Sequence, residues 1–203
     1  QTVISDKGGH HGHHHVAAAS EDAAIAAQEA LGKHFPVRRL RGMKGGVLFD
    51  IEEGRRIHEY RFADTPVGNG GVRQNGGSFL AINYGRMARL RPVTGYPDSY
   101  DWTGNVVHPE DDGVFKVDVQ SETKELLVSF RQLRDFLLER HPRVAETPLF
   151  INHTLWNREG DRLFFFVRGN WSDRERRVNI PMTMRSDGTE LHEQSVFIGG
   201  HPE

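Results

Sequence analysis

Histidine is the residue type whose spacing in this chain most suggests chemistry. The chain contains 12 histidines, and several stand directly before short runs that read as strands: His13, His14, His15, His153 and His201. Neutral imidazoles that converge from several strands commonly bind a divalent transition metal. We therefore predict a metal site formed by His14, His15, His153 and His201, with Mn, Ca or Zn as the bound ion.

The first group of histidines admits another interpretation. Residues 8–15 read Gly-Gly-His-His-Gly-His-His-His. This is also the composition of an exposed tract that binds metals loosely, or of an affinity-tag remnant. The glycine inside the tract, and its direct continuation into a predicted strand, argue against a tag. Isolated histidines such as His58, His108 and His141 are typical of ordinary surface or core positions, and we assign them no role.

A four-strand unit that recurs along the chain must position these side chains. Its first hairpin is clearest at 152–156 and 163–167, where the turn Asn-Arg-Glu-Gly-Asp joins two strands. Earlier copies are 70–73 with 79–82, offset by 83 residues, and a degenerate pair at 15–19 and 25–27. Its second hairpin occurs at 47–51 with 55–60, at 115–119 with 123–128, and at 180–184 with 189–193.

Four antiparallel strands joined by tight turns describe one blade of a β-propeller. The predicted fold is therefore all-β, a single partial propeller domain over 1–203 with about three blades and the start of a fourth. Closed propellers need about 4–8 blades, so we expect a fragment of a ring of roughly 6–8, or one arc of an oligomeric ring. The expected blades are about 8–64, about 65–130, about 148–197 and a beginning at 198–203.

Three segments depart from the strand pattern. Apolar residues recur at helical spacing between 130 and 141, which predicts a short amphipathic helix there. Residues 20–31 suit either a helix, with a serine cap before it and a glycine after it, or a strand in register with the other units. The register favours the strand. The long connection 83–112 is predicted to be a binding loop.

Three short motifs lie in the last quarter of the chain: Gly-His-Pro-Glu at 200–203, Ser-Asp-Gly at 186–188 and Val-Arg-Gly-Asn-Trp at 167–171. They are similar to the metal-binding motif, the hairpin turn and the base-bearing segment of one family. The stretch 152–203 resembles a blade of the oligogalacturonate lyases and the related TolB-like propellers. The resemblance implies a metal-assisted lyase acting on uronate-containing saccharides, with His201 as a metal ligand.

The chain departs from that family at the catalytic base, because Val167 stands where the lyases have histidine. β-Elimination from a uronate needs a base for the proton on carbon five and a cation beside the carboxylate. The base is open among His153 and the phenolates of Tyr84 and Tyr96. Arg168 is predicted to clamp the carboxylate through its planar guanidinium. The predicted catalytic residues are thus His153, Arg168 and Tyr84.

The connection 83–112 combines arginines with aromatic residues, the composition of a site for an anionic sugar. Arginine pairs with carboxylate or sulfate, and aromatic rings offer flat apolar faces to a sugar ring. The same composition also suits solvated loop charges with aromatic anchors. The predicted substrate-binding residues are Arg86, Arg89, Arg91, Tyr96 and Trp102 from this connection, together with Asn69.

The composition argues against several classes of protein. The formal net charge is -2, so no overall positive field recruits nucleic acid. Cysteine is absent, which excludes disulfides and thiolate metal sites. No apolar run approaches the ~20 residues needed to cross a bilayer, and no signal-peptide pattern is visible. The expected partner is an acidic oligosaccharide, and the compartment, cytoplasm or periplasm, stays open, as does the oligomeric state.

Two functions fit these observations. The first is a metal-assisted enzyme acting on acidic saccharides, a lyase that works by β-elimination. The alternative is a non-catalytic TolB-like propeller that binds a ligand or a protein at the same place. The recurring histidines and the arginine-aromatic connection favour the lyase, and the missing base histidine favours the binding module.

Overall fold

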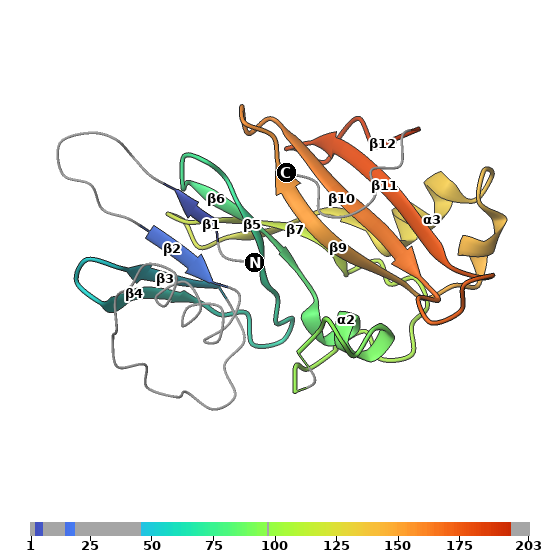
Figure 1. The fold of residues 1–203 in the computed structure, drawn as a ribbon, viewed down its shortest axis with the longest axis horizontal. Coiled ribbons are helices and arrows are strands. Elements are labelled where there is room, and N and C mark those ends of the chain that lie inside the picture. Colours follow the sequence, from blue (N-terminus) through green and yellow to red (C-terminus); the bar gives the residue numbers. More distant parts are fainter. Residues whose placement is uncertain (1–2, 6–14, 19–45, 97, 196–203) are drawn as a thin grey trace.

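Three four-stranded antiparallel sheets make up most of the protein (Figure 1). The structure is a computed structural model that describes residues 3–5, 15–18, 46–96 and 98–195, with side chains from residue 46 onward. In each sheet, strands that follow one another in the sequence are hydrogen-bonded neighbours. Sheet 1 contains β1 (Val3–Ser5), β2 (His15–Ala18), β3 (Gly46–Asp50) and β4 (Arg55–Tyr60). Sheet 2 contains β5 (Gly68–Val72), β6 (Ser78–Ile82), β7 (Gly113–Asp118) and β8 (Lys124–Ser129). Sheet 3 contains β9 (Leu149–Trp156), β10 (Arg162–Gly169), β11 (Val178–Arg185) and β12 (His192–Glu193).

Two apolar cores hold the sheets together. The larger core lies between sheets 2 and 3, where Leu80 and Phe165 are fully buried. The smaller core joins sheet 1 to sheet 2, with the ring of Tyr60 packed edge-on against Phe79 at a centroid distance of 5.2 Å. Sheet 2 therefore lies between the other two (Figure 1).

The helix between sheets 2 and 3 is α3 (Phe130–Leu137), followed by the 3₁₀ helix η1 (Pro142–Ala145). Ser129 begins α3 with a capping box. The hydroxyl of Ser129 accepts from the N–H of Gln132, and the side-chain oxygen of Gln132 accepts from the N–H of Ser129. The predicted helix over 130–141 is confirmed, although the α-helix ends at Leu137. Among the described residues, no helix is long and apolar enough to cross a membrane.

The prediction of a mostly β chain built from four-stranded antiparallel units is confirmed, and the strands of sheets 2 and 3 lie where the repeats place them. The first unit needs a correction. The strand predicted to open it, β2, pairs with both β1 and β3 and is therefore the second strand. Strand β1 has three residues, too few to show an alternating pattern. The strand predicted at 25–27 lies outside the described residues.

The connection 83–112 was predicted to be a loop, but it begins with the helix α2 (Tyr84–Leu90). Asn83 caps this helix by accepting a hydrogen bond from the N–H of Arg86 at 2.9 Å. The loop that follows packs closely on α2, since a Cβ on Gly95 would lie 2.1 Å from the backbone nitrogen of Ala88. The helix has only seven residues and one of them is glycine, so its period was not visible in the sequence.

Candidate functional site

Strands β5 and β9 bring sheets 2 and 3 into direct contact. Two glycines allow this approach. A Cβ on Gly70 would lie 2.1 Å from Oγ1 of Thr154, and a Cβ on Gly71 would lie 2.4 Å from the carbonyl oxygen of Thr154. The indole N–H of Trp156 donates to the carbonyl oxygen of Gly71 at 3.2 Å. The two strands are thus held at a separation that leaves no room for a side chain at Gly70 or Gly71.

Both strands carry a β-bulge at this contact. In β5 the register shifts between Asn69 and Gly71, so Gly70 is the extra residue. In β9 the register shifts so that two residues, His153 and Thr154, lie opposite one residue of β10. Bulges interrupt the alternation of side chains and re-aim them, which is why they often occur beside functional sites.

Equivalent asparagines stabilise the two bulges. Oδ1 of Asn69 accepts from the N–H of Gly71 at 2.9 Å, and Oδ1 of Asn152 accepts from the N–H of His153 at 2.8 Å. The two asparagines are 83 residues apart, which is the offset of the repeated hairpins. The repeat therefore places an asparagine beside the bulge in both sheets, although Asn69 bonds the N–H two residues on and Asn152 bonds that of the next residue.

A pocket of about 340 Å³ lies against these two bulges, a volume within the range of small-molecule sites. Five of the predicted site residues line it, coming from sheet 2, from α2 with its following loop, and from sheet 3: Asn69, Tyr84, Arg91, Tyr96 and His153. Among the described lining residues there is no lysine and no carboxylate, and Arg91 is the one permanently charged side chain. The pocket is therefore polar, aromatic and weakly positive.

Two tyrosines form an aromatic wall of the pocket. The hydroxyl of Tyr84 donates to the carbonyl oxygen of Asn69 at 3.0 Å, and the ring of Tyr96 lies 4.7 Å from that of Tyr84. Burial, assisted by Tyr96, raises the pKa of Tyr84 far above its ordinary value. The phenol of Tyr84 therefore stays protonated, and we do not retain it as a catalytic base.

His153 reaches the pocket from an unusual backbone conformation. Its φ of 55° lies in the left-handed region, which residues other than glycine rarely adopt. Strained positions of this kind cluster at active sites and ligand contacts. The imidazole packs edge-on against Phe166 at a centroid distance of 6.0 Å, which orients the ring at the pocket wall.

Arg91 enters the pocket from the end of α2. It is the C-cap residue of that helix, with its N–H bonded to the carbonyl oxygen of Met87 at 2.7 Å. Its half-buried guanidinium lies 4.5 Å from the ring centroid of Trp171, a residue of the connection after β10. The charge is thus positioned by a helix on one sheet and an indole on the next.

Arg86, which was predicted to bind substrate, lies in the core and is 1% exposed. Its Nε donates to the carbonyl oxygen of Leu149 at 2.6 Å. Nη1 donates to Oγ1 of Thr103 at 2.9 Å and to the carbonyl oxygen of Val106 at 3.1 Å, and Nη2 donates to that of Val107 at 2.7 Å. These bonds tie the connection 83–112 to β9. We therefore withdraw Arg86 from the predicted sugar site.

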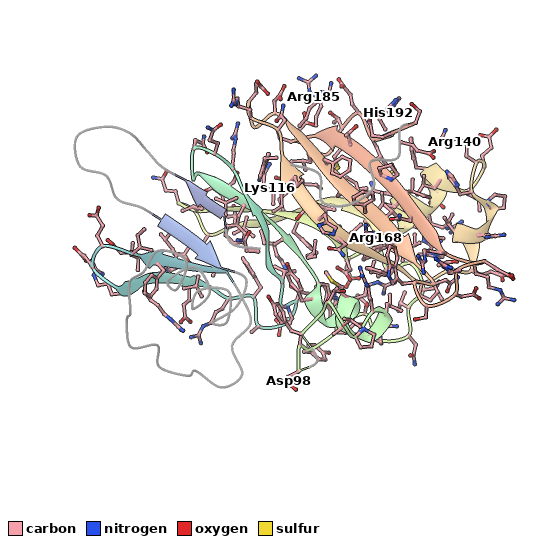
Figure 2. The ribbon with its side chains drawn as sticks, in the orientation of Figure 1. Asp98, Lys116, Arg140, Arg168, Arg185 and His192 are labelled. Carbon is pink, nitrogen blue, oxygen red and sulfur yellow. The ribbon has the colours of Figure 1, made fainter. Side chains whose placement is uncertain are left out.

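Three other predicted residues also lie away from the pocket lining. Arg89 pairs with Asp101 through an Nε–Oδ2 distance of 2.8 Å. Trp102 packs against the smaller core. Arg168 lies on β10, as Figure 2 shows. It is 6% exposed and donates its Nε–H to Oδ1 of Asn179 at 2.8 Å.

Of the four predicted metal ligands, only His153 has a described side chain, so the predicted metal site stays a prediction. His14 and His201 lie outside the described part of the chain, and His15 belongs to β2, of which only the backbone is described. His153 lines the pocket. No group of three or more His, Asp or Glu side chains among the described residues is placed to hold an ion.

Sequence reasoning missed several lining residues. Asn152 and Thr154 line the pocket from β9, and Met87 and Thr94 line it from α2 and the loop after it. For Asn152 a signal existed, because it stands 83 residues after Asn69, which was predicted. Nothing in the sequence indicated Met87 and Thr94, since their positions depend on α2, which the spacing of apolar residues did not predict.

A fully buried carboxyl group, Asp112, ends the same connection. Nδ2 of Asn83 donates to its Oδ2 at 3.0 Å, and the N–H of Gly113 donates to its Oδ1 at 2.8 Å. Burial raises the pKa of Asp112 to about 7, although Asn83 and the nearby Arg86 oppose this change. The carboxyl group is thus about half protonated at neutral pH.

Replacing Asp112 with asparagine tests this assignment. A folded pKa near 7 lies above the ordinary value of about 4, so the folded protein binds the extra proton between these pH values. The resulting stabilisation is complete below about pH 4 and is lost as the pH rises through 7. The free energy of unfolding of the wild type relative to D112N should therefore increase by on the order of 4 kcal/mol from pH 8 to pH 4. Urea unfolding of both proteins across this range checks it, and a difference independent of pH would contradict it.

No protein-family model matches the chain, and comparison with curated proteins and with solved structures finds no match either.

Proposed function

We propose that this chain is part of a β-propeller that binds an acidic, uronate-containing oligosaccharide in the pocket between β5 and β9. The three consecutive four-stranded antiparallel sheets, with sheet 2 between the others, support the propeller, since each has the form of a blade. The recurrence of a bulge at the same place in sheets 2 and 3, with an asparagine that bonds a backbone N–H beside it, supports it further.

The composition of the pocket lining carries the binding proposal. One guanidinium, that of Arg91, lies in a pocket whose other described lining residues carry no carboxylate, and two tyrosines provide a flat apolar wall. Arginine matches a uronate carboxylate with two parallel hydrogen bonds. The side-chain amides of Asn69 and Asn152 lie at the bulges and are suited to sugar hydroxyl groups. A neutral sugar would leave the guanidinium without a partner.

Replacing Arg91 with glutamine tests the binding proposal. Loss of a charge-assisted hydrogen bond costs about 1.5–3 kcal/mol, which corresponds to binding weaker by roughly tenfold to a hundredfold. Isothermal titration calorimetry with trigalacturonate measures this change. Arg89→Gln is the matched control, because it removes the same charge from the same helix at a residue that does not line the pocket. Equal loss in both variants, or equal binding of a neutral galactose oligomer, would count against the site.

A second candidate, the lyase, is favoured by one observation: His153 lines the same pocket as Arg91. In that reaction His153 removes the proton on carbon five, the glycosidic oxygen on carbon four leaves, and a double bond forms between the two carbons. Arg91 pairs with the carboxylate that acidifies the proton. A rise in ultraviolet absorbance during the trigalacturonate incubation, lost in His153→Gln, supports the lyase, and its absence supports the binding module. The metal-assisted form, with His201 as a ligand, stays a prediction.

A further inference from the structure

Three arginines surround Trp171, and we refer to these four residues as the Trp171 arginine cluster. The guanidinium carbons of Arg91, Arg168 and Arg177 lie 4.5, 4.6 and 4.6 Å from the indole centroid. They come from three segments: the end of α2, the strand β10 and the residue just before β11. One indole therefore contacts three positive charges, two from its own segment of the chain and one, that of Arg91, from a segment distant in sequence.

No carboxylate compensates this charge. Within residues 46–96 and 98–195, none of the three arginines forms an ion pair. Burial, together with Arg91 and Arg177, lowers the pKa of Arg168 to about 10, and burial together with Arg177 lowers that of Arg91. The positive charges of the cluster therefore repel one another.

The hydrogen bonds inside the cluster go to neutral acceptors, and they orient the guanidiniums. Nε of Arg168 donates to Oδ1 of Asn179 at 2.8 Å. Nε and Nη2 of Arg177 donate to the carbonyl oxygen of Trp171 at 3.1 and 2.8 Å. Both Nη groups of Arg168, Nη1 of Arg177 and the guanidinium of Arg91 keep donors that no described residue accepts. Fixed, unused donors with excess positive charge are the elements of an anion site.

The cluster also lies between two hollows. Arg91 lines the pocket described above, and Arg177 lines a second pocket of about 340 Å³ with Asn179 and His141. Arg168 is the buried member, held by Asn179. Two of the three guanidiniums therefore belong to residues that line a pocket.

We propose that the Trp171 arginine cluster binds a phosphate dianion, either free or as a phosphate monoester. A carboxylate neutralises one of three charges, whereas a dianion neutralises two and offers several oxygens to the separate guanidiniums. Arginine is favoured over lysine at such sites because its planar fork matches phosphate geometry. This inference does not rest on the proposed sugar site, with which it shares only Arg91.

Titration with sodium phosphate tests the cluster, with tryptophan fluorescence as the readout because the ring of Trp171 is the centre of the site. The titration is made at about pH 8, where phosphate is mostly a dianion, and at constant ionic strength. The wild type should show a saturable change in emission and a rise in unfolding temperature with phosphate. Arg177→Gln should bind at least tenfold more weakly, and Arg176→Gln, an exposed neighbour paired with Asp173, should bind like the wild type.

Three results would overturn the proposal: no response to phosphate in the wild type, an equal response to acetate at the same ionic strength, or equal weakening in Arg177→Gln and Arg176→Gln. If Arg177→Gln does not fold, Arg177→Lys keeps the charge and loses the fork, and it should still bind more weakly. Glycerol 3-phosphate in a parallel titration distinguishes the two sources, because tighter binding than free phosphate identifies an ester. Galacturonate binding in Arg177→Gln reports on the sugar site separately, since Arg177 does not line that pocket.

Discussion

Replacing Arg86 with alanine will lower the free energy of unfolding by about 3–5 kcal/mol. The guanidinium is the hydrogen-bond partner of three backbone carbonyl groups and one hydroxyl, and it also lies 4.5 Å from the ring centroid of Phe130. Alanine would leave the carbonyl oxygen of Leu149 and the hydroxyl of Thr103 buried without this donor, and it would open a cavity between the connection 83–112 and β9. Urea denaturation followed by circular dichroism measures the change.

Arg89→Ala is the matched control, because Arg89 lies three residues after Arg86 in the same helix but outside the core. Its side chain is 36% exposed, and its partner Asp101 keeps hydrogen bonds from Asn83 and Thr103 when Arg89 is removed, so the loss should cost less than about 1 kcal/mol. Equal costs for the two variants would contradict the structural role of Arg86. Arg86→Lys should recover little, because an ammonium group cannot reach four separated acceptors at once.

Replacing Gly71 with alanine will destabilise the protein by about 3 kcal/mol. The added Cβ would lie 2.4 Å from the carbonyl oxygen of Thr154, which belongs to the backbone of β9 and cannot rotate away. Sheets 2 and 3 must then separate at the strands that form the pocket. Thermal unfolding should therefore show a lower midpoint, and trigalacturonate binding should weaken even though Gly71 itself is not a lining residue.

Gly77→Ala controls for the general cost of changing a glycine in the same hairpin. Gly77 is exposed, and its nearest neighbour is the flexible side chain of Asn75, 3.3 Å from the added atom. The substitution should change the free energy of unfolding by no more than about 0.5 kcal/mol. A loss of stability in Gly77→Ala as large as in Gly71→Ala would show that the sheet contact is not the cause.

The sequence was most informative where the repeat is regular. The hairpins of sheets 2 and 3 could be located because their turns and apolar strands recur at a fixed offset, and the helix α3 because its apolar residues are spaced by three and four. The helix α2 could not be located, since its fold depends on Arg86, whose partners lie up to 63 residues away. Tertiary contacts of that kind leave no local pattern.

In the candidate site, too, residues predicted from the repeat lie in the pocket, whereas some predicted from composition do not. Asn69 and His153 were identified from their place in the repeat, and both line the pocket. Arg86 and Trp102 were predicted from residue type alone; Arg86 is instead buried against backbone carbonyl groups, and Trp102 packs against the smaller core. Composition shows that a guanidinium or an indole is present. Only packing decides whether that side chain faces a ligand or is buried, where a guanidinium donates hydrogen bonds to backbone carbonyl groups.

Each sheet is made from one uninterrupted stretch of chain, and this has a consequence for synthesis on the ribosome. Sheet 2 has all four strands by residue 129, before the first residue of sheet 3 is made. Translation adds about 5–20 residues per second, whereas hairpins form within about 1–10 microseconds, so the nascent sheet 2 can pair its strands long before β9 emerges. The newly made β9 then docks on the exposed apolar face of sheet 2, and its Thr154 packs against Gly70 and Gly71 of β5.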